Sequence, residues 1–323
     1  MPPVYSTCQV KYKGRYGYLI GWIFTFIDFV VMNATFVAVA WMNHVTHLIA
    51  PLPLLALNVA MMVTTMATRG IHTRRTVYLD QALLEMLKEL DRICRKHDIP
   101  YFLYWGTLLG AIRHDGFIPW DDDLDVGLMR EDYKRLMDVL PSELPEHIVL
   151  QNNDTDKNFF CFFAKLRDKR SLLDEGSYDR VFKERGIFID LFPFDTISPT
   201  TQRWRLQSLT FTIFRAGNGS PASMRLIRAL TWFNRHVTFP VLRLYSRIIR
   251  CKKVTFDYGV PFHKVHDKSE IFPLATHVFE GMETFVPGKS HEVLKSLYGD
   301  YMKLPPDLDN VYHHVERLEF YDD

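Results

Sequence analysis

The chain has 323 residues, which is enough for one large domain or two smaller ones. Its hydrophobic content of 47% and charged content of 24% are those of an ordinary globular protein. The formal net charge of +1 argues against nucleic acid as a partner. The four cysteines form no CxxC pair and no Cys/His spacing of a zinc site, so a zinc-binding module is not expected.

Two apolar stretches near the amino terminus are long enough to cross a bilayer. Residues 18–42 contain Asp28 as their only formal charge, and residues 48–67 contain none. About 20 apolar residues are needed to span the hydrocarbon core. The sequence predicts a membrane segment over residues 1–75, in the form of a two-span hairpin, with membrane lipid as a partner. One span plus a buried helix, two core helices, or a cleaved signal peptide are the alternatives.

The basic residues around these stretches predict their orientation. Lys11, Lys13 and Arg15 precede the first stretch, and Arg69 is the next Lys or Arg along the chain. Positive flanks stay on the cytoplasmic side of a membrane. A hairpin would therefore leave the remaining domain, residues 76–323, facing the cytoplasm. A single span would place that domain on the lumenal or extracytoplasmic side.

The globular part is predicted to begin near residue 76 with a helix. Apolar residues recur every three or four positions over residues 77–97, which is typical of one face of an amphipathic helix. Ile99-Pro100 should end this helix, because the residue before proline avoids helical angles. Residues 101–105 then read as a short strand.

A Gly106-Thr107 turn is predicted next, followed by a short helix over residues 108–114. Gly106 can let the backbone approach a phosphate closely. Thr107 could cap the helix or offer its hydroxyl to a ligand. The start of a helix is a natural anion site. A simple turn with no ligand is the alternative.

Four carboxylates follow within five positions: Asp121, Asp122, Asp123 and Asp125. Like charges at contact distance repel by about 4 kcal/mol at an effective dielectric of about 20. Hard carboxylate oxygens are what Mg²⁺ selects, and Mg²⁺ in turn holds phosphate oxygens. The cluster therefore predicts a metal-dependent phosphate site that uses Mg²⁺ or Mn²⁺. A solvated acidic turn is the alternative, and the apolar neighbours argue against it.

The alternation of apolar and acidic residues over 124–126 predicts a strand with one face lining this site. Asp123 and Asp125 are two positions apart, so their side chains should share a face. Asp122 should point the other way. A helix is predicted over residues 133–140, ended by the proline that follows it.

A second strand-like stretch, residues 159–167, ends in two cations. Lys165 and Arg167 are two positions apart and should share a face, where they could clamp donor phosphates. Solvated charges at the end of a strand are the alternative.

A third stretch, residues 186–194, encloses Asp190 in otherwise apolar sequence. A carboxylate in such a strand is costly unless it is paired or bound to metal. A third metal ligand is one interpretation, and a backbone cap or an arginine pair is the other. Asp195 could substitute for Asp190 or hydrogen-bond behind it.

A basic helical region is predicted over residues 200–253. It contains eleven Lys or Arg residues and no Asp or Glu. Helices with basic faces can lie on an anionic membrane surface. An ordinary helical subdomain with a solvated face is the alternative. The rest of the chain, rich in aromatic residues and proline, is predicted to be a helical or irregular cap that lines a substrate pocket.

Several of these motifs together resemble the LicD/fukutin family. The resemblance rests on Gly-Thr-Leu-Leu-Gly-Ala-Ile-Arg-His at 106–114 and on Gly-Phe-Ile-Pro-Trp-Asp-Asp-Asp-Leu-Asp at 116–125. It extends to residues 163–168, 186–193 and 298–305, and covers roughly residue 77 to the carboxyl end. It implies an α+β fold with a nucleotidyltransferase-like mixed sheet flanked by helices.

The resemblance also implies an activity. Members of this family transfer a phosphorylated alcohol from a nucleotide-activated donor to a glycan, such as phosphocholine from CDP-choline or ribitol phosphate from CDP-ribitol. The expected partners are a CDP-activated donor and a hydroxyl of a glycan or glycolipid acceptor, as in lipopolysaccharide or teichoic acid biosynthesis. The reaction expected is in-line attack on the donor phosphorus with release of CMP.

The family motifs carry site roles onto matching positions. Asp123 and Asp125 match the metal-binding pair, and Asp190 matches a third carboxylate that could also accept the acceptor proton. The residues expected to contact the donor are Gly106, Thr107, Arg113, Lys165 and Arg167, with His114 as a further contact.

Two other functions stay open from the sequence. A nucleotide-sugar glycosyltransferase also uses a DxD motif to bind a metal diphosphate, but would release a nucleoside diphosphate in place of CMP. A non-catalytic membrane protein could use the same domain for binding alone.

Overall fold

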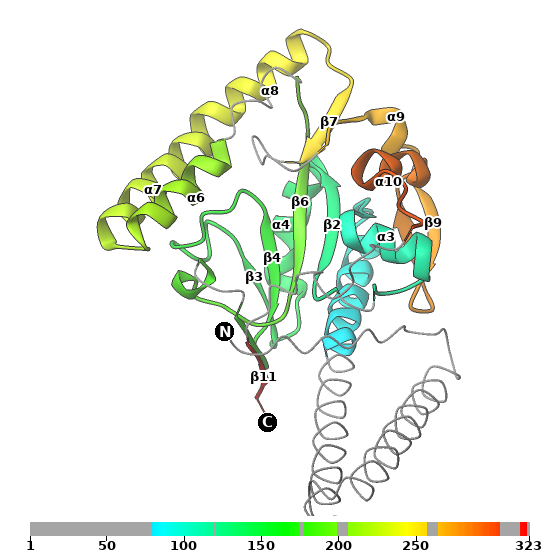
Figure 1. Ribbon diagram of the computed structural model, residues 1–323, viewed down its shortest axis with the longest axis horizontal. Helices are drawn as coiled ribbons and strands as arrows, with labels where there is room; N and C mark the ends of the chain where they lie inside the picture. The colour runs from blue at the N-terminus through cyan, green and yellow to red at the C-terminus, as the bar shows by residue number, and fades with distance from the viewer. Residues whose placement is uncertain are drawn as a thin grey trace, which may run out of the picture. The chain divides into compact units, whose positions relative to one another are not determined.

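The computed structural model describes residues 79–118, 121–174, 178–198, 206–256, 264–303 and 317–321 (Figure 1). The chain divides into two compact units, Met1–Tyr78 and Leu79–Asp323, and the second contains all the described residues. The predicted spans at 18–42 and 48–67, and their orientation, lie outside those residues. Within the described part of the chain, every helix is too short or too polar to cross a bilayer.

A mixed sheet of seven strands forms the centre of the domain. Its main path runs in the order β1 (Phe102–Leu103), β2 (Leu124–Met129), β6 (Phe188–Thr196), β4 (Ala164–Asp168) and β3 (Ile148–Gln151). Strands β2 and β6 are parallel, and the other pairings in this sheet are antiparallel. Two further strands, β7 (Lys253–Phe256) and β8 (His266–Asp267), extend the sheet beyond the end of β6.

Strand β6 is the central strand of this sheet. Its residues are buried from Phe188 to Asp195, as expected for a strand that is covered on both faces. One edge of β6 pairs with β2, and the other edge pairs first with β4 and then with β7. The strand therefore joins all parts of the sheet, and any charged side chain in it must find partners inside the fold.

Two helices supply much of the apolar core beside the sheet. A helix over residues 79–96 buries Leu83 and Leu90, and α4 (Arg130–Glu143) buries Leu136 and Leu140 in the same cluster. The first agrees with the predicted helix. The predicted end of the second at the proline was wrong, because Pro141 lies inside the last turn and the Leu144 amide still donates to the Leu140 carbonyl.

Helix α3 (Trp105–His114) begins three residues before its predicted start. Gly106 and Thr107 lie in its first turn and do not form a separate turn ahead of it. Tyr104 is the N-cap and makes no side-chain capping bond, so the predicted capping role of Thr107 was wrong. The helix ends at Asp115, which has a left-handed φ of 49°.

The carboxyl-terminal part contains more strand than predicted. The hairpin of β9 (Ala275–Phe279) and β10 (Met282–Val286) turns at Glu280 and Gly281, whose φ angles of 48° and 79° suit a tight hairpin. Other elements outside the central sheet are α9 (Lys268–Ile271), α10 (Ser290–Tyr298), a short helix at Asp179–Val181, and the pair β5 (Ser171–Asp174) and β11 (Arg317–Phe320). The prediction of a mixed α+β domain is confirmed, and the wholly helical or irregular end was wrong.

The basic region is helical, as predicted, and forms an arm beside the sheet. Its elements are α6 (Leu206–Gly217), α7 (Pro221–Phe233), a π-helical turn at Asn234–Thr238, and α8 (Phe239–Ile248). Figure 1 shows α6 beside α7, with α8 continuing the line of α7. The inner face of the arm packs on two small clusters around Phe160 and Phe162.

Candidate active site

The sheet register brings together residues that are far apart in the sequence. Asp125 of β2 lies directly opposite Asp190 of β6 in the parallel pair. Lys165 of β4 lies opposite Asp190 on its other side. Side chains at opposed positions of adjacent strands project from the same face of a sheet. One face of the sheet therefore carries carboxylate, carboxylate and ammonium in a row.

Lys165 is in contact with one of these two carboxylates. Its Nζ lies 3.0 Å from Oδ1 of Asp190 and 3.2 Å from the centre of the Phe188 ring. Only 2% of the lysine is exposed, and 7% of Asp190. An ammonium buried this deeply needs a negative partner, and here it has the carboxylate and the face of an aromatic ring.

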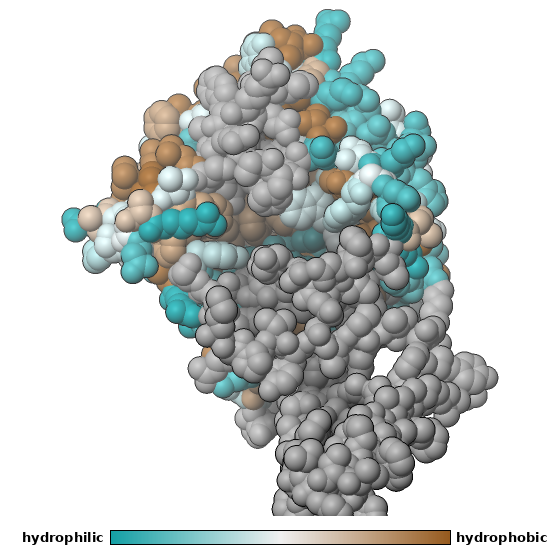
Figure 2. Space-filling view, in the orientation of Figure 1, coloured by the Kyte–Doolittle hydropathy of each residue, from teal (hydrophilic) through white to brown (hydrophobic). Residues whose placement is uncertain are grey.

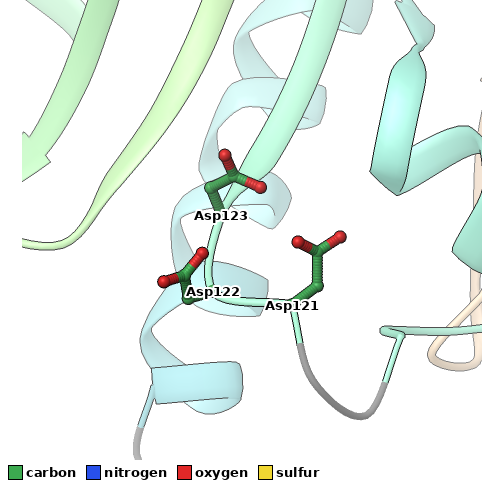
Figure 3. Close-up of side chains that lie close together, drawn as sticks. All are labelled: Asp121, Asp122 and Asp123. Atoms are coloured by element: carbon green, nitrogen blue, oxygen red, sulfur yellow. The ribbon is translucent and has the colours of Figure 1, made fainter. Parts of the chain in front are cut away.

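Three further carboxylates gather on the segment that leads into β2. Oxygens of Asp121, Asp122 and Asp123 lie within 4.8 Å of one another (Figure 3). The prediction that Asp122 points away from Asp123 was wrong, because oxygens of both belong to this cluster. Strand alternation does not govern these residues, because β2 begins only at Leu124. The result is an acidic cluster that could bind a metal ion.

The carboxylates from the two segments perturb one another. Burial, together with Asp125, Asp121, Asp122 and Asp190, raises the pKa of Asp123 well above its ordinary value. Burial and Asp190 raise the pKa of Asp125 in the same way, with Lys165 opposing. Burial and Asp122 raise the pKa of Asp121 to about 7. These side chains form one electrostatic unit, of the kind that a divalent cation relieves.

The first turn of α3 holds Asp125 in place. The backbone amide of Asp125 donates to Oγ1 of Thr107 at 2.7 Å, and Thr107 is only 4% exposed. A backbone hydrogen bond from Gly106 to the Asp125 carboxylate lowers its pKa and partly offsets the burial. Thr107 and Gly106 thus fix the strand that carries the aspartates. The donor contacts predicted for them remain proposals.

Gly106 also leaves room for Asp121. A Cβ placed on Gly106 would lie 2.6 Å from Oδ2 of Asp121. We expect Gly106→Ala to push this carboxylate aside and to lower turnover about tenfold, since small misplacements in a site are costly. Stability should change by less than about 1 kcal/mol, because alanine favours a helix. Turnover and thermal unfolding of the variant measure the two effects.

Gly110→Ala is the matched control on the same helix. Its Cβ would meet the backbone oxygen of Gly116 at 2.5 Å, which cannot move as a side chain can. This variant should lose about 1–3 kcal/mol of stability. A Gly106→Ala enzyme with wild-type turnover would contradict the placement of Asp121.

Tyr298 is a site residue that the sequence analysis did not single out. Its side chain is 45% exposed, and partial desolvation together with the nearby charges of Asp125, Asp121 and Asp123 raises the pKa of its phenol, while Arg113 lowers it. It is the last residue of α10, and Figure 1 shows this helix beside α3. The signal was present, because Tyr298 opens the last of the family-like motifs.

Arg113 lies near the end of α3 and is half-buried. It donates from Nη1 to the Tyr301 carbonyl at 3.0 Å and from Nε to Nε2 of His114 at 2.9 Å. Burial lowers the pKa of Arg113, and burial with the adjacent guanidinium lowers that of His114 to about 4. His114 is therefore neutral at pH 7 and accepts from the arginine, which orients it.

Two charged residues that the sequence placed near the site are engaged elsewhere. Arg167 is fully buried and donates to Gln151 and to the Gly186 carbonyl, and the donor contact predicted for it stays a prediction. Asp195 pairs with Arg130 at 2.6 Å and lies 3.6 Å from Arg243. The idea that Asp195 replaces or supports Asp190 was wrong, because Asp195 ties α4 and α8 to the sheet.

The raised pKa values predict how stability depends on pH. A carboxyl whose pKa is higher in the folded than in the unfolded chain loses stability as the pH rises between the two values. Metal-free protein should therefore be less stable at about pH 8 than at about pH 5, since unfolded Asp titrates near 4 and Asp121 near 7. Thermal unfolding in EDTA measures this.

Asp121→Asn is the diagnostic variant for this effect. It should flatten the pH dependence, and Mg²⁺ should stabilise the wild type more at the higher pH, where the ligands are deprotonated. Equal pH profiles for the variant and the wild type would show that the aspartates are not crowded.

Comparison with known proteins covers the part of the chain that contains this site. The profile of the LicD/FKTN/FKRP nucleotidyltransferase domain matches residues 98–244, which include all the aspartates of the site. The lipopolysaccharide cholinephosphotransferase LicD of Haemophilus influenzae is 31% identical over 255 residues, covering 72% of this chain and 93% of that protein. Human ribitol 5-phosphate transferase FKRP is 40% identical over 52 residues, 16% of this chain and 10% of that protein.

A mixed sheet that places acidic and basic side chains from β2, β4 and β6 side by side, preceded by a cluster of aspartates, defines a phosphotransferase site. The chain belongs to the LicD/FKTN/FKRP nucleotidyltransferase-domain family. The predicted family and the predicted phosphotransferase class are confirmed. Family membership also favours this class over the glycosyltransferase and over the non-catalytic binding protein.

Proposed function

We propose that this protein transfers a phosphorylated alcohol from a CDP-activated donor to a hydroxyl of a lipid-linked or cell-surface glycan. The observation that carries the proposal is the opposed register of Asp125, Asp190 and Lys165 beside the acidic cluster, in a chain of this family. Such an arrangement can hold the charges of a diphosphate and receive a proton within one site.

The donor set suits a hard divalent cation. Asp123 and Asp125 would hold Mg²⁺ or Mn²⁺, with Asp190 as the third carboxylate, because Asp190 lies opposite Asp125 in the sheet and the charges of both raise the pKa of Asp123. The bound ion would supply charge neutralisation on the donor diphosphate. Asp121 and Asp122 adjoin Asp123 and add negative charge that favours cation binding.

Residues of the chain itself accept the proton, position the carboxylates and contact the donor. Asp190 accepts the proton of the acceptor hydroxyl, whose oxygen bonds to the donor phosphorus. The bond from phosphorus to the CMP oxygen breaks, and CMP leaves. Lys165 holds the Asp190 carboxylate through its 3.0 Å ion pair, opposite Asp125 in the sheet. Arg113 and Tyr298, at the edge of the aspartates, contact the donor.

Phosphocholine is the group that the comparisons support best. The cholinephosphotransferase matches this chain over 93% of its own length, whereas the ribitol 5-phosphate transferase matches over only 10%. The acceptor by the same argument is a lipopolysaccharide-like glycolipid. Transfer of ribitol 5-phosphate is the second candidate, supported by the 40% identity of the shorter match.

The test is a transfer assay with the full chain and a membrane glycolipid fraction. Labelled CDP-choline and CDP-ribitol are supplied in parallel, and both the label in glycan and the released nucleotide are measured. We expect choline label in the glycan, CMP as the product, and loss of both with EDTA. Release of CDP, or label from neither donor under any divalent ion, would contradict the proposal.

A further inference from the structure

The helical arm of α6, α7 and α8 has an outer face that is strongly apolar. Figure 2 shows hydrophobic side chains gathered along this arm. The exposed large residues on the line of α7 and α8 are Leu226, Trp232, Phe233, Val237, Val241, Leu244, Tyr245, Ile248 and Ile249. Several are about half exposed or more, including Val241 and Leu244 at 58% each and Ile248 at 70%.

These residues form a stripe and are not scattered. Leu226, Phe233, Val237, Val241, Leu244 and Ile248 recur at intervals of three, four or seven, which places them on one side of a helix. From Pro221 to Ile248 the helix is continuous through its π-helical turn. At 1.5 Å per residue the stripe lies along a rod of about 40 Å.

The opposite side of the same helical rod packs against the domain. Met224 and Ile227 pack in the cluster around Phe160, while Phe239 and Leu242 pack in the cluster around Phe162. The π-helical turn falls between these two sets and shifts the register by one residue, so both contacts are made. The fold thus fixes which side faces outward, and the apolar stripe is on that side.

The positive charge of the arm indicates what kind of surface the stripe binds. Residues 200–253 contain no acidic side chain, and Arg225, Arg228, Arg247 and Arg250 are exposed along the same arm. Arg247 also lies 3.7 Å from Glu131 of α4. The guanidinium groups of Arg225 and Arg228 donate to carbonyls of their own helix. An apolar stripe edged with arginines fits a bilayer surface with anionic headgroups, where the stripe enters the acyl boundary and the cations reach the headgroups.

We propose that the α7–α8 rod lies on an anionic membrane surface through the stripe from Leu226 to Ile248. The proposal does not depend on the identity of the donor or acceptor. It is also separate from the predicted amino-terminal spans, since it concerns where the arm lies and not whether the chain is anchored. The arm is joined to the catalytic sheet by Arg243 and Asp195, so its docking would fix the site at the bilayer.

The experiment uses the full chain reconstituted in vesicles, with an environment-sensitive probe on single cysteines. Leu244→Cys and Ile248→Cys report the stripe, and Val278→Cys, equally apolar and 52% exposed on β9, is the matched control. Cys8 and Cys251 are replaced by serine, while Cys94 and Cys161 are buried. Quenching by spin-labelled lipid and by aqueous iodide is measured, with and without phosphatidylglycerol in phosphatidylcholine.

With anionic lipid, we expect the stripe probes to be quenched by lipid at least about twofold more than the Val278 probe, and less by iodide. The difference should shrink in neutral vesicles and when Arg225, Arg228, Arg247 and Arg250 are changed to Gln. Equal quenching at all three positions would overturn the proposal, even if the chain is anchored elsewhere. Protection of the stripe probes from both quenchers would overturn it as well, in favour of a protein partner.

Discussion

Asp125→Asn is expected to lower turnover by at least about 10²-fold, because it removes charge stabilisation at the transferring phosphoryl group. Asp125 is the residue through which the site is assembled. It lies opposite Asp190, its amide bonds Thr107, and its carboxylate perturbs Asp123. Asparagine keeps the shape of the side chain and loses a ligand charge, so the loss should appear mainly in kcat.

The measurement is steady-state CMP release with saturating donor and Mg²⁺. Asp154→Asn is the control, since Asp154 is an exposed aspartate that pairs with Arg235 outside the site. The control should retain wild-type turnover. Turnover of Asp125→Asn within about twofold of wild type would remove this residue from the chemistry.

Asp195→Asn is expected to lower the free energy of unfolding by about 3 kcal/mol, although Asp195 lies outside the aspartate cluster. The Asp195 carboxylate is 2% exposed and lies beside the guanidinium groups of Arg130 and Arg243. Removing the negative charge leaves two partly buried cations without it, which is the costly way to break a buried ion pair. Urea unfolding followed by circular dichroism measures the change.

The exposed pair of Asp154 and Arg235 again serves as the comparison. Its carboxylate is 70% exposed, so Asp154→Asn should cost less than about 1 kcal/mol. If both variants lost the same small free energy of unfolding, the ion pairs of Asp195 would not be what holds the arm to the sheet. If Asp195→Asn abolished turnover in a fully stable protein, its assignment away from the site would be wrong.

Asp190 illustrates how much of the site could be predicted from the sequence. A lone aspartate in an apolar strand requires a partner, and the sequence predicted a metal ion, a backbone cap or an arginine for this role. The structure provides Lys165 at 3.0 Å and Asp125 in the opposed position. The requirement is local and can be predicted. The register between β2 and β6 is a long-range pairing, and no pattern within either strand specifies it.

The errors have a shared physical cause. Asp122 was placed by strand alternation, which indicates the face of a residue but not its partner, and Asp195 was placed by its closeness to Asp190 along the chain. Asp122 precedes β2 and does not follow its pleat. Asp195 is paired with Arg130, which approaches from α4. Contacts between elements depend on packing that a single chain segment does not encode.

The sequence of the β9–β10 turn could have predicted this hairpin. Glu280-Gly281 between two apolar alternating stretches is typical of a two-residue hairpin, and the structure places the β9–β10 turn there. This hairpin supports the site, since the Glu280 amide donates to the Asp115 carbonyl and its carboxylate accepts from the Phe117 amide. It thereby holds the loop that leads to the aspartates.

The most direct test of the central claim is a crystal structure of the protein with Mn²⁺ and donor, with the metal located by its anomalous scattering. We predict a peak about 2.2 Å from carboxylate oxygens of both Asp123 and Asp125, which joins the acidic cluster to β2. A peak held by Asp121 and Asp122 alone, or donor bound with no metal near Asp125, would contradict the account.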